Sequence, residues 1–178
     1  HAARTQLYTD EIASGQLNKL EHPSGTFSGG YFASEGEIFV TYTSTRQPAS
    51  IIALDAQTGA QNRVVLSAGD APQGSAWRSV TFPSLDGTPI QGWLSVPEGD
   101  GPFATIIDIH GGPTAAQMET FNPAAEAWVD HGFAWLSVNY RGSTTFGKDF
   151  ERAIWGRLGM VEVEDLVGAR NWLVESGI

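Results

Sequence analysis

Hydrophobic residues follow different patterns in the two halves of the chain. Up to about residue 74 they occur in short runs, such as 36–43 and 50–55, that are rich in β-branched and aromatic residues and predict strands. No helical stripe occurs in this half, and we therefore predict that residues 1–74 are all β. Turn residues separate the runs at Ser34-Glu35-Gly36, Arg46-Gln47-Pro48 and Gln57-Thr58-Gly59.

A weak internal repeat runs through this first half. Shifting the sequence by 44 positions aligns Leu7-Tyr8 with Ile51-Ile52, and residues 18–20 with 62–64. A repeat of this length, with strand, turn and strand in each unit, is typical of β-propeller blades. Residues 26–67 would then form about one four-stranded blade, and residues 1–20 would complete the blade before it. Since one blade cannot cover both faces of its sheet, we expect further blades upstream. The alternative is two β-hairpins that resemble each other by chance.

From residue 75 onward the pattern predicts a different kind of sheet. Residues 77–82 and 90–96 flank an Asp-Gly turn and predict a hairpin. The nearly continuous apolar run 103–109 predicts a strand buried on both faces of a parallel sheet, and residues 133–138 predict a second buried strand.

Two helices are predicted around the second buried strand. One covers 124–132, and its helical spacing comes from Phe121, Ala125, Trp128 and Val129. The other covers 160–176, with Gly177 as its stop and with acids in its first turns, where the helix dipole favours them. Its acids are Glu162, Glu164 and Asp165, and its predicted buried face is Val163, Leu166, Ala169 and Leu173. The order hairpin, strand, helix, strand, helix indicates that residues 75–178 open an α/β sheet.

Composition narrows the function classes. The 178 residues are 41% hydrophobic and 17% charged, which suits a globular protein with a core. The lack of cysteine excludes disulfides, thiolate metal sites and cysteine nucleophiles. A net charge of −10 argues against binding nucleic acid, which needs a basic face. Since no phosphate-binding glycine loop, metal-ligand cluster or dinucleotide fingerprint occurs, we infer no cofactor.

The sequence also gives an expectation about location. No run approaches the roughly 20 apolar residues of a membrane span, so we expect no membrane partner. The chain starts at His1 without the pattern of a signal peptide. We expect a cytoplasmic protein, unless an amino-terminal signal has been removed, and we expect that both ends of the sequence are cut.

The sharpest chemical motif is His110-Gly111-Gly112-Pro113, directly after the run that ends at Ile109. Two glycines allow backbone N–H groups to approach a ligand atom that any Cβ would hold off. In α/β hydrolases the loop after this strand donates one N–H to the oxyanion of acyl transfer. Gly111 and Gly112 are therefore the candidate oxyanion-hole residues. A glycine turn that only leaves a strand is the alternative.

A second polar loop, Asn139-Tyr-Arg-Gly-Ser-Thr144, follows the second buried strand. It lies at the carboxyl edge of the predicted sheet, where α/β ligand sites usually occur. Arg141 could bind a substrate carboxylate or carbonyl there, and it is our candidate substrate-binding residue. It could equally pair with a neighbouring acid and fix the loop.

These motifs, in this order and followed by Phe146-Gly147 and Phe150, resemble the prolyl oligopeptidase family of serine peptidases, in particular its acylaminoacyl-peptidase and dipeptidyl-aminopeptidase branches. The resemblance covers essentially the whole chain. It implies that residues 1–74 end a β-propeller and that residues 75–178 are the amino-terminal half of an α/β-hydrolase domain. It also implies hydrolysis of peptide bonds near the amino end of short peptides, with Gly111 and Gly112 in the oxyanion hole.

One departure from the family matters for function. The nucleophile elbow Gly-x-Ser-x-Gly-Gly occurs nowhere in these residues, and His22, His110 and His131 have no candidate serine and aspartate partners for a triad. We therefore expect an incomplete fold, inactive alone, whose partners are a short peptide or acyl substrate and the rest of the hydrolase domain or another copy of the chain. The alternatives are a truncated, non-catalytic relative that serves as a binding or assembly module, and an esterase of similar architecture.

Overall fold

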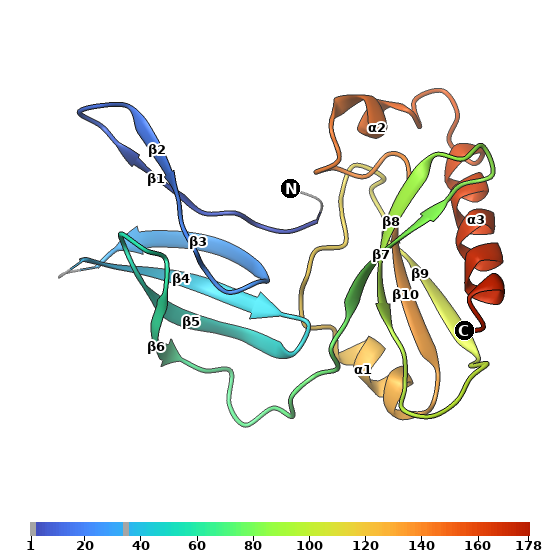
Figure 1. The fold of residues 1–178 in the computed structure, drawn as a ribbon, viewed down its shortest axis with the longest axis horizontal. Coiled ribbons are helices and arrows are strands. Elements are labelled where there is room, and N and C mark those ends of the chain that lie inside the picture. The colour runs from blue at the N-terminus through green and yellow to red at the C-terminus, as the bar shows by residue number, and fades with distance from the viewer. Residues whose placement is uncertain (1–2, 34–35) are drawn as a thin grey trace. The chain divides into compact units, whose positions relative to one another are not determined.

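The computed structural model describes residues 3–33 and 36–178, whose contacts divide the chain into two units. The first unit contains Ala3–Gly74 together with Met118–Phe121, and the second contains Ser75–Gln117 and Asn122–Ile178. The four residues Met118–Phe121 thus pack with the first unit although the second unit surrounds them in sequence. Each unit is described by itself, and Figure 1 shows the ribbon of both.

The described part of the first unit is built from antiparallel strands. Four of them pair in chain order, β3-β4-β5-β6, and the other two form the separate hairpin β1-β2 (Figure 1). A four-stranded antiparallel sheet of this order is consistent with the predicted propeller segment. The strands are β1 Tyr8–Glu11, β2 Gln16–Lys19, β3 Thr26–Phe32, β4 Glu37–Ser44, β5 Gln47–Asp55 and β6 Gln61–Leu66.

The internal repeat falls on matching strands of this unit. Residues 18 and 19 lie in β2, and their repeat partners 62 and 63 lie in β6. In the same way, Tyr8 begins β1 and Ile52 lies in β5. The hairpin β1-β2 therefore occupies the place in one repeat that β5-β6 occupies in the next. That residues 1–20 complete an earlier blade stays a prediction.

The predicted turns need one correction. The turn between β4 and β5 is at Thr45-Arg46, whereas Gln47 and Pro48 already belong to β5. Proline is tolerated here because it lies at the start of the strand, next to an irregularity in the pairing with β4. The Gln57-Thr58-Gly59 turn is confirmed. Ser34 and Glu35 lie outside the described residues.

The second unit is a mixed sheet of order β7-β8-β10-β9 with helices on both faces (Figure 1). β7 and β8 form the predicted antiparallel hairpin, and β10 is antiparallel to β8 and parallel to β9. The short helix α2 was not predicted. The elements are β7 Arg78–Pro83, β8 Pro89–Ser95, β9 Thr105–Ile109, α1 Pro123–Asp130, β10 Ala134–Asn139, α2 Lys148–Arg152 and α3 Val161–Glu175.

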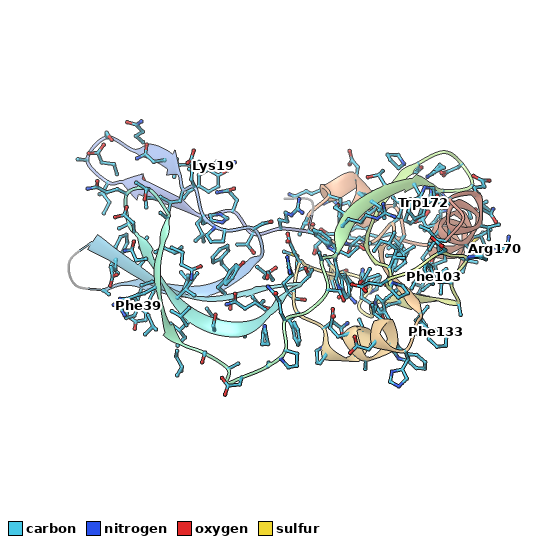
Figure 2. All side chains as sticks on the ribbon, turned by 60° about the horizontal axis from the view of Figure 1, so that its bottom comes forward. Lys19, Phe39, Phe103, Phe133, Arg170 and Trp172 are labelled. Atoms are coloured by element: carbon cyan, nitrogen blue, oxygen red, sulfur yellow. The ribbon has the colours of Figure 1, made fainter. Side chains whose placement is uncertain are left out.

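Alternation along β10 shows which helix covers which face. Leu136 and Val138 belong to a core cluster that includes Leu173 of α3. Trp135 clusters instead with Val129 of α1. Because successive side chains of a strand point to opposite faces, α1 and α3 cover opposite sides of the sheet. Trp172 of α3 is labelled in Figure 2 and stacks on the sheet residue Phe82, with ring centroids 5.6 Å apart.

Two predictions about burial and one about helical spacing were wrong. β9 is only half-buried, because it is one of the two edge strands of this sheet. Phe121 is not part of α1 but packs with the first unit. On α3 the buried face includes Asp165, which forms a buried ion pair. Val163 is 48% exposed because two helical positions are about 200° apart, which places it on the side opposite Asp165.

Candidate functional site

The loops after β9 and β10 meet at one edge of the sheet. The two strands are parallel, and Val138 pairs with Ile109 at their carboxyl ends. Both motifs singled out from the sequence begin directly after these strands. Backbone and side-chain hydrogen bonds then join the two loops, and one of them is the 2.8 Å bond from Thr144 N to Ala115 O. The structure thus brings residues 110–117 and 139–144 together, as their positions in the sequence suggested.

Gly111 and Gly112 lie exposed at the tip of the first loop. Gly112 has a φ of +136°, and a Cβ added to it would lie 2.9 Å from Thr114 N, so only glycine fits there without strain. A Cβ on Gly111 would meet open space. In the described part of the chain, no acceptor takes the amide hydrogen of either glycine. Two backbone donors are therefore available to a ligand at this loop.

His110 contacts both loops. Its Nε2 lies 2.8 Å from Ser143 Oγ, its Nδ1 lies 2.9 Å from Gly111 O, and its ring stacks on Tyr140 at 4.5 Å. The contact of His110 with Ser143 was not foreseen from the sequence, because residues 33 positions apart meet only when β9 and β10 pair. The pair is not a catalytic dyad, however. Ser143 is fully buried. The other ring nitrogen, Nδ1, contacts the backbone carbonyl of Gly111, whereas in a triad it contacts a carboxylate.

Tyr140, directly after β10, holds the start of the glycine loop. Its hydroxyl donates a 2.7 Å hydrogen bond to His110 O. Burial, with a smaller contribution from the negative charge of Glu162, raises the pKa of the Tyr140 hydroxyl above its ordinary value. The hydroxyl therefore keeps its proton and stays a donor at neutral pH.

Asn139 holds the far end of the same loop. This fully buried side chain accepts a 2.8 Å hydrogen bond from Gln117 N, donates to Gln117 O at 3.0 Å and donates to Gln91 Oε1 at 2.6 Å. Trp93 Nε1 also donates to Gln117 O. The loop is thus anchored at both ends, and the glycines lie between the anchors.

A row of hydrogen-bonded polar side chains, partly or fully buried, connects this loop to the sheet, and the sequence analysis missed it. Asp108 Oδ2 accepts hydrogen bonds from Gln117 Nε2 at 2.7 Å and from Ser137 Oγ at 2.8 Å. Ser137 in turn accepts one from Trp135 Nε1. Asp108 and Ser137 pair directly across β9 and β10. The signal in the sequence was a polar residue inside each of two apolar runs.

Arg141 forms ion pairs with neighbouring acids, which hold its loop in place. Its side chain is 7% exposed, and it binds the fully buried carboxylate of Asp165 through Nε at 2.9 Å and Nη2 at 2.7 Å. Asp86 and Glu164 bind it from the rim, at 2.6 and 3.1 Å. Its role in substrate binding stays a prediction.

The charges of this cluster support one another. Burial alone would lower the pKa of Arg141, but the hydrogen bonds and charges of Asp165 and Asp86 raise it above its ordinary value. Hydrogen bonds from Thr88, and then the Arg141 guanidinium, lower the pKa of Asp86 to about 2. Arg141 therefore stays charged, and the loop that carries Tyr140 and Ser143 is held by ion pairs.

Chemically, the loop offers backbone hydrogen-bond donors. Among residues 3–33 and 36–178, no cluster of three or more His, Asp or Glu side chains could hold a metal ion. No helix in that part is long and apolar enough to cross a membrane. The exposed glycine amides can stabilise negative charge on a ligand oxygen.

Comparisons with known proteins point to one family. Residues 119–178 match the sequence model of the Prolyl oligopeptidase family. Dipeptidyl aminopeptidase BIII of Pseudoxanthomonas mexicana is 32% identical over 108 residues, which are 56% of this chain and 16% of that protein. Acylamino-acid-releasing enzyme 2 of Oryza sativa subsp. japonica is 31% identical over 74 residues, 42% of this chain and 10% of that protein.

A solved structure shows the same fold. The puromycin-hydrolyzing peptidase of Mycobacterium tuberculosis matches with a TM-score of 0.83 at 23% identity, over 97% of this chain and 28% of that one. Together these findings confirm the similarity to the prolyl oligopeptidase family that the motifs indicated. The chain spans less than a third of the length of each of these relatives.

Proposed function

We propose that this chain, with its similarity to the prolyl oligopeptidase family, is the part of a serine peptidase that supplies the oxyanion loop. Residues 1–74 would end a β-propeller, and residues 75–178 would be the amino-terminal half of an α/β-hydrolase domain. The names of the two relatives, a dipeptidyl aminopeptidase and an acylamino-acid-releasing enzyme, support a peptide substrate that is cleaved near its amino end.

The observation that carries this proposal is the pair of unpaired amides at Gly111 and Gly112, at the end of a strand in a mixed sheet. When a nucleophile attacks an acyl carbon, the carbonyl oxygen becomes negatively charged. N–H groups that are already in place stabilise this charge without reorganisation, and loss of one such donor costs about 10²–10³ in turnover. Gly112 is the main candidate donor, and Gly111 is the second.

The nucleophile lies elsewhere in this proposal. No Gly-x-Ser-x-Gly occurs in the 178 residues. Among residues 3–33 and 36–178, the one serine that hydrogen-bonds to an imidazole is Ser143, which is fully buried. The loop would therefore stabilise the oxyanion of an acyl-enzyme reaction. The serine, aspartate and histidine of that reaction would come from another segment or another chain. The 178 residues alone would give no turnover.

Two measurements test the proposal. The full-length protein that carries these residues is expected to hydrolyse dipeptidyl or N-acyl-aminoacyl p-nitroanilides and to be labelled by a fluorophosphonate. The 178-residue chain is expected to show no acylation burst with an activated ester. A burst from the isolated chain would contradict the external nucleophile.

The labelling also separates the alternatives. A labelled species much larger than 178 residues supports the peptidase. An unlabelled source protein of only this length would support a non-catalytic binding or assembly module instead. Hydrolysis of simple esters without any amide hydrolysis would favour an esterase of similar architecture.

A further inference from the structure

We propose that Tyr140 and His110 are positioning residues that set the directions of the Gly111 and Gly112 N–H groups. This inference rests on the proposed oxyanion role of the two glycines. In a trans peptide unit the C=O and N–H bonds point in opposite directions. A hydrogen bond to the carbonyl oxygen therefore fixes the direction of the amide hydrogen in the same unit.

The first peptide unit joins His110 O to the amide of Gly111. Its carbonyl accepts the 2.7 Å hydrogen bond from the Tyr140 hydroxyl. Tyr140 is itself held firmly, because it is 4% exposed and its backbone carbonyl accepts a 3.0 Å hydrogen bond from Ser143 N. The direction of the Gly111 N–H is thus set from β10, on the opposite side of the peptide.

The second peptide unit joins Gly111 O to the amide of Gly112. Here His110 Nδ1 lies 2.9 Å from the carbonyl oxygen. A carbonyl only accepts hydrogen bonds, so Nδ1 carries the hydrogen. The ring is kept in this orientation by Ser143 Oγ, 2.8 Å from Nε2, and by its stacking on Tyr140 with an angle of 17° between the rings.

The two bonds leave the loop with one bonded side and one free side. Both carbonyls have side-chain donors, while no described residue accepts from either amide hydrogen. Donors fixed in advance are worth more in catalysis than donors that must turn toward the charge as it forms. Without the carbonyl-side bonds, a glycine loop would be free to rotate these peptide units.

Conservative variants of the full-length protein separate positioning from mere packing. Tyr140→Phe removes only the hydroxyl. His110→Asn keeps an N–H donor near the place of Nδ1, whereas His110→Gln moves the donor toward the place of Nε2. The assay is the steady-state hydrolysis of an N-acyl-aminoacyl p-nitrophenyl ester, with kcat and KM measured separately and with a thermal melt for each variant.

We expect Tyr140→Phe and His110→Gln to lower kcat by about 10- to 100-fold with KM nearly unchanged, because the oxyanion exists only in the transition state. His110→Asn should retain kcat within about threefold of wild type, since its amide can still bind Gly111 O. The proposal is overturned if the Asn and Gln variants are equally impaired, or if Tyr140→Phe retains full kcat.

Crystal structures of Tyr140→Phe and His110→Gln give a readout that does not depend on activity. We expect a changed direction of the His110 carbonyl in the first variant and of the Gly111 carbonyl in the second. Unchanged directions in both would overturn the positioning role even if kcat falls. If the wild-type protein hydrolyses no acyl substrate, the proposed function fails, and these structures still decide the positioning.

Discussion

Replacing Asp165 by alanine tests whether the loop after β10 depends on a buried ion pair. The carboxylate is fully buried and accepts hydrogen bonds from Arg141 N at 2.7 Å, from Arg141 Nε at 2.9 Å and from Ser84 Oγ at 2.6 Å. Alanine would leave these donors without their acceptor and Arg141 without its buried counter-charge. Breaking a buried pair by removing one partner costs about 3–5 kcal/mol. We expect the free energy of unfolding to fall by that amount.

Glu164→Gln is the matched control on the same helix. Glu164 binds the same guanidinium at 3.1 Å, but its side chain is 36% exposed. A pair at the solvent-exposed rim contributes about 0–1 kcal/mol, so this variant should change stability little. Both variants remove one negative charge beside Arg141. The difference between their free energies of unfolding therefore measures the effect of burying the carboxylate.

Urea unfolding followed by tryptophan fluorescence is a suitable assay, because all six tryptophans lie in residues 75–178 and report the second unit alone. The reasoning would be refuted if Asp165→Ala cost less than about 1 kcal/mol, or no more than Glu164→Gln. An unchanged m-value would show that the comparison concerns stability rather than the compactness of the unfolded chain.

Three further predictions concern stability and pH. Gly168→Ala should destabilise the second unit by about 1–3 kcal/mol in urea unfolding, because the added Cβ would lie 2.4 Å from Pro83 O, and this clash outweighs the gain in helix propensity. Asn139→Leu should cost about 1–3 kcal/mol for each buried polar group that it leaves unbonded, measured in the same way. The carboxyl of Asp86 should titrate near pH 2 in an NMR titration, because hydrogen bonds from Thr88 and then Arg141 lower its pKa. Its contribution to stability is present above the unfolded pKa of 3.8 and is lost as the pH falls toward 2.

Each of these predictions has a contrary outcome. A stabilised Gly168→Ala variant would show that α3 can move away from β7. An Asn139→Leu variant with unchanged stability would show that the hydrogen bonds between Asn139 and the backbone of Gln117 do not stabilise the fold. An Asp86 pKa close to 3.8 would mean that neither Thr88 nor Arg141 binds the carboxylate in solution.

The sequence predicted the elements better than their environments. The runs at 77–82, 90–96 and 133–138 became β7, β8 and β10, and Gly177 ends α3 with a φ of +72°. In contrast, the run at 103–109 became an edge strand. Apolar composition indicates a strand, but it does not show how many neighbours the strand has.

At the candidate site, the loops could be predicted from the sequence, but the hydrogen bonds between them could not. The positions of Gly111 and Gly112 after an apolar run could be predicted because motif and strand are adjacent in sequence. The contacts of His110 with Ser143, and of Arg141 with Asp165, join residues more than 20 positions apart. Such pairs depend on strand register and helix placement, which hydrophobic spacing does not specify.

The most direct test of the oxyanion role is a crystal structure of the full-length protein after reaction with a fluorophosphonate. The phosphonyl oxygen of such an adduct stands in for the oxyanion of acyl transfer. The account predicts this oxygen about 2.7–3.1 Å from Gly112 N, with Gly111 N as the second candidate donor. A labelled serine whose phosphonyl oxygen binds neither glycine amide would contradict it.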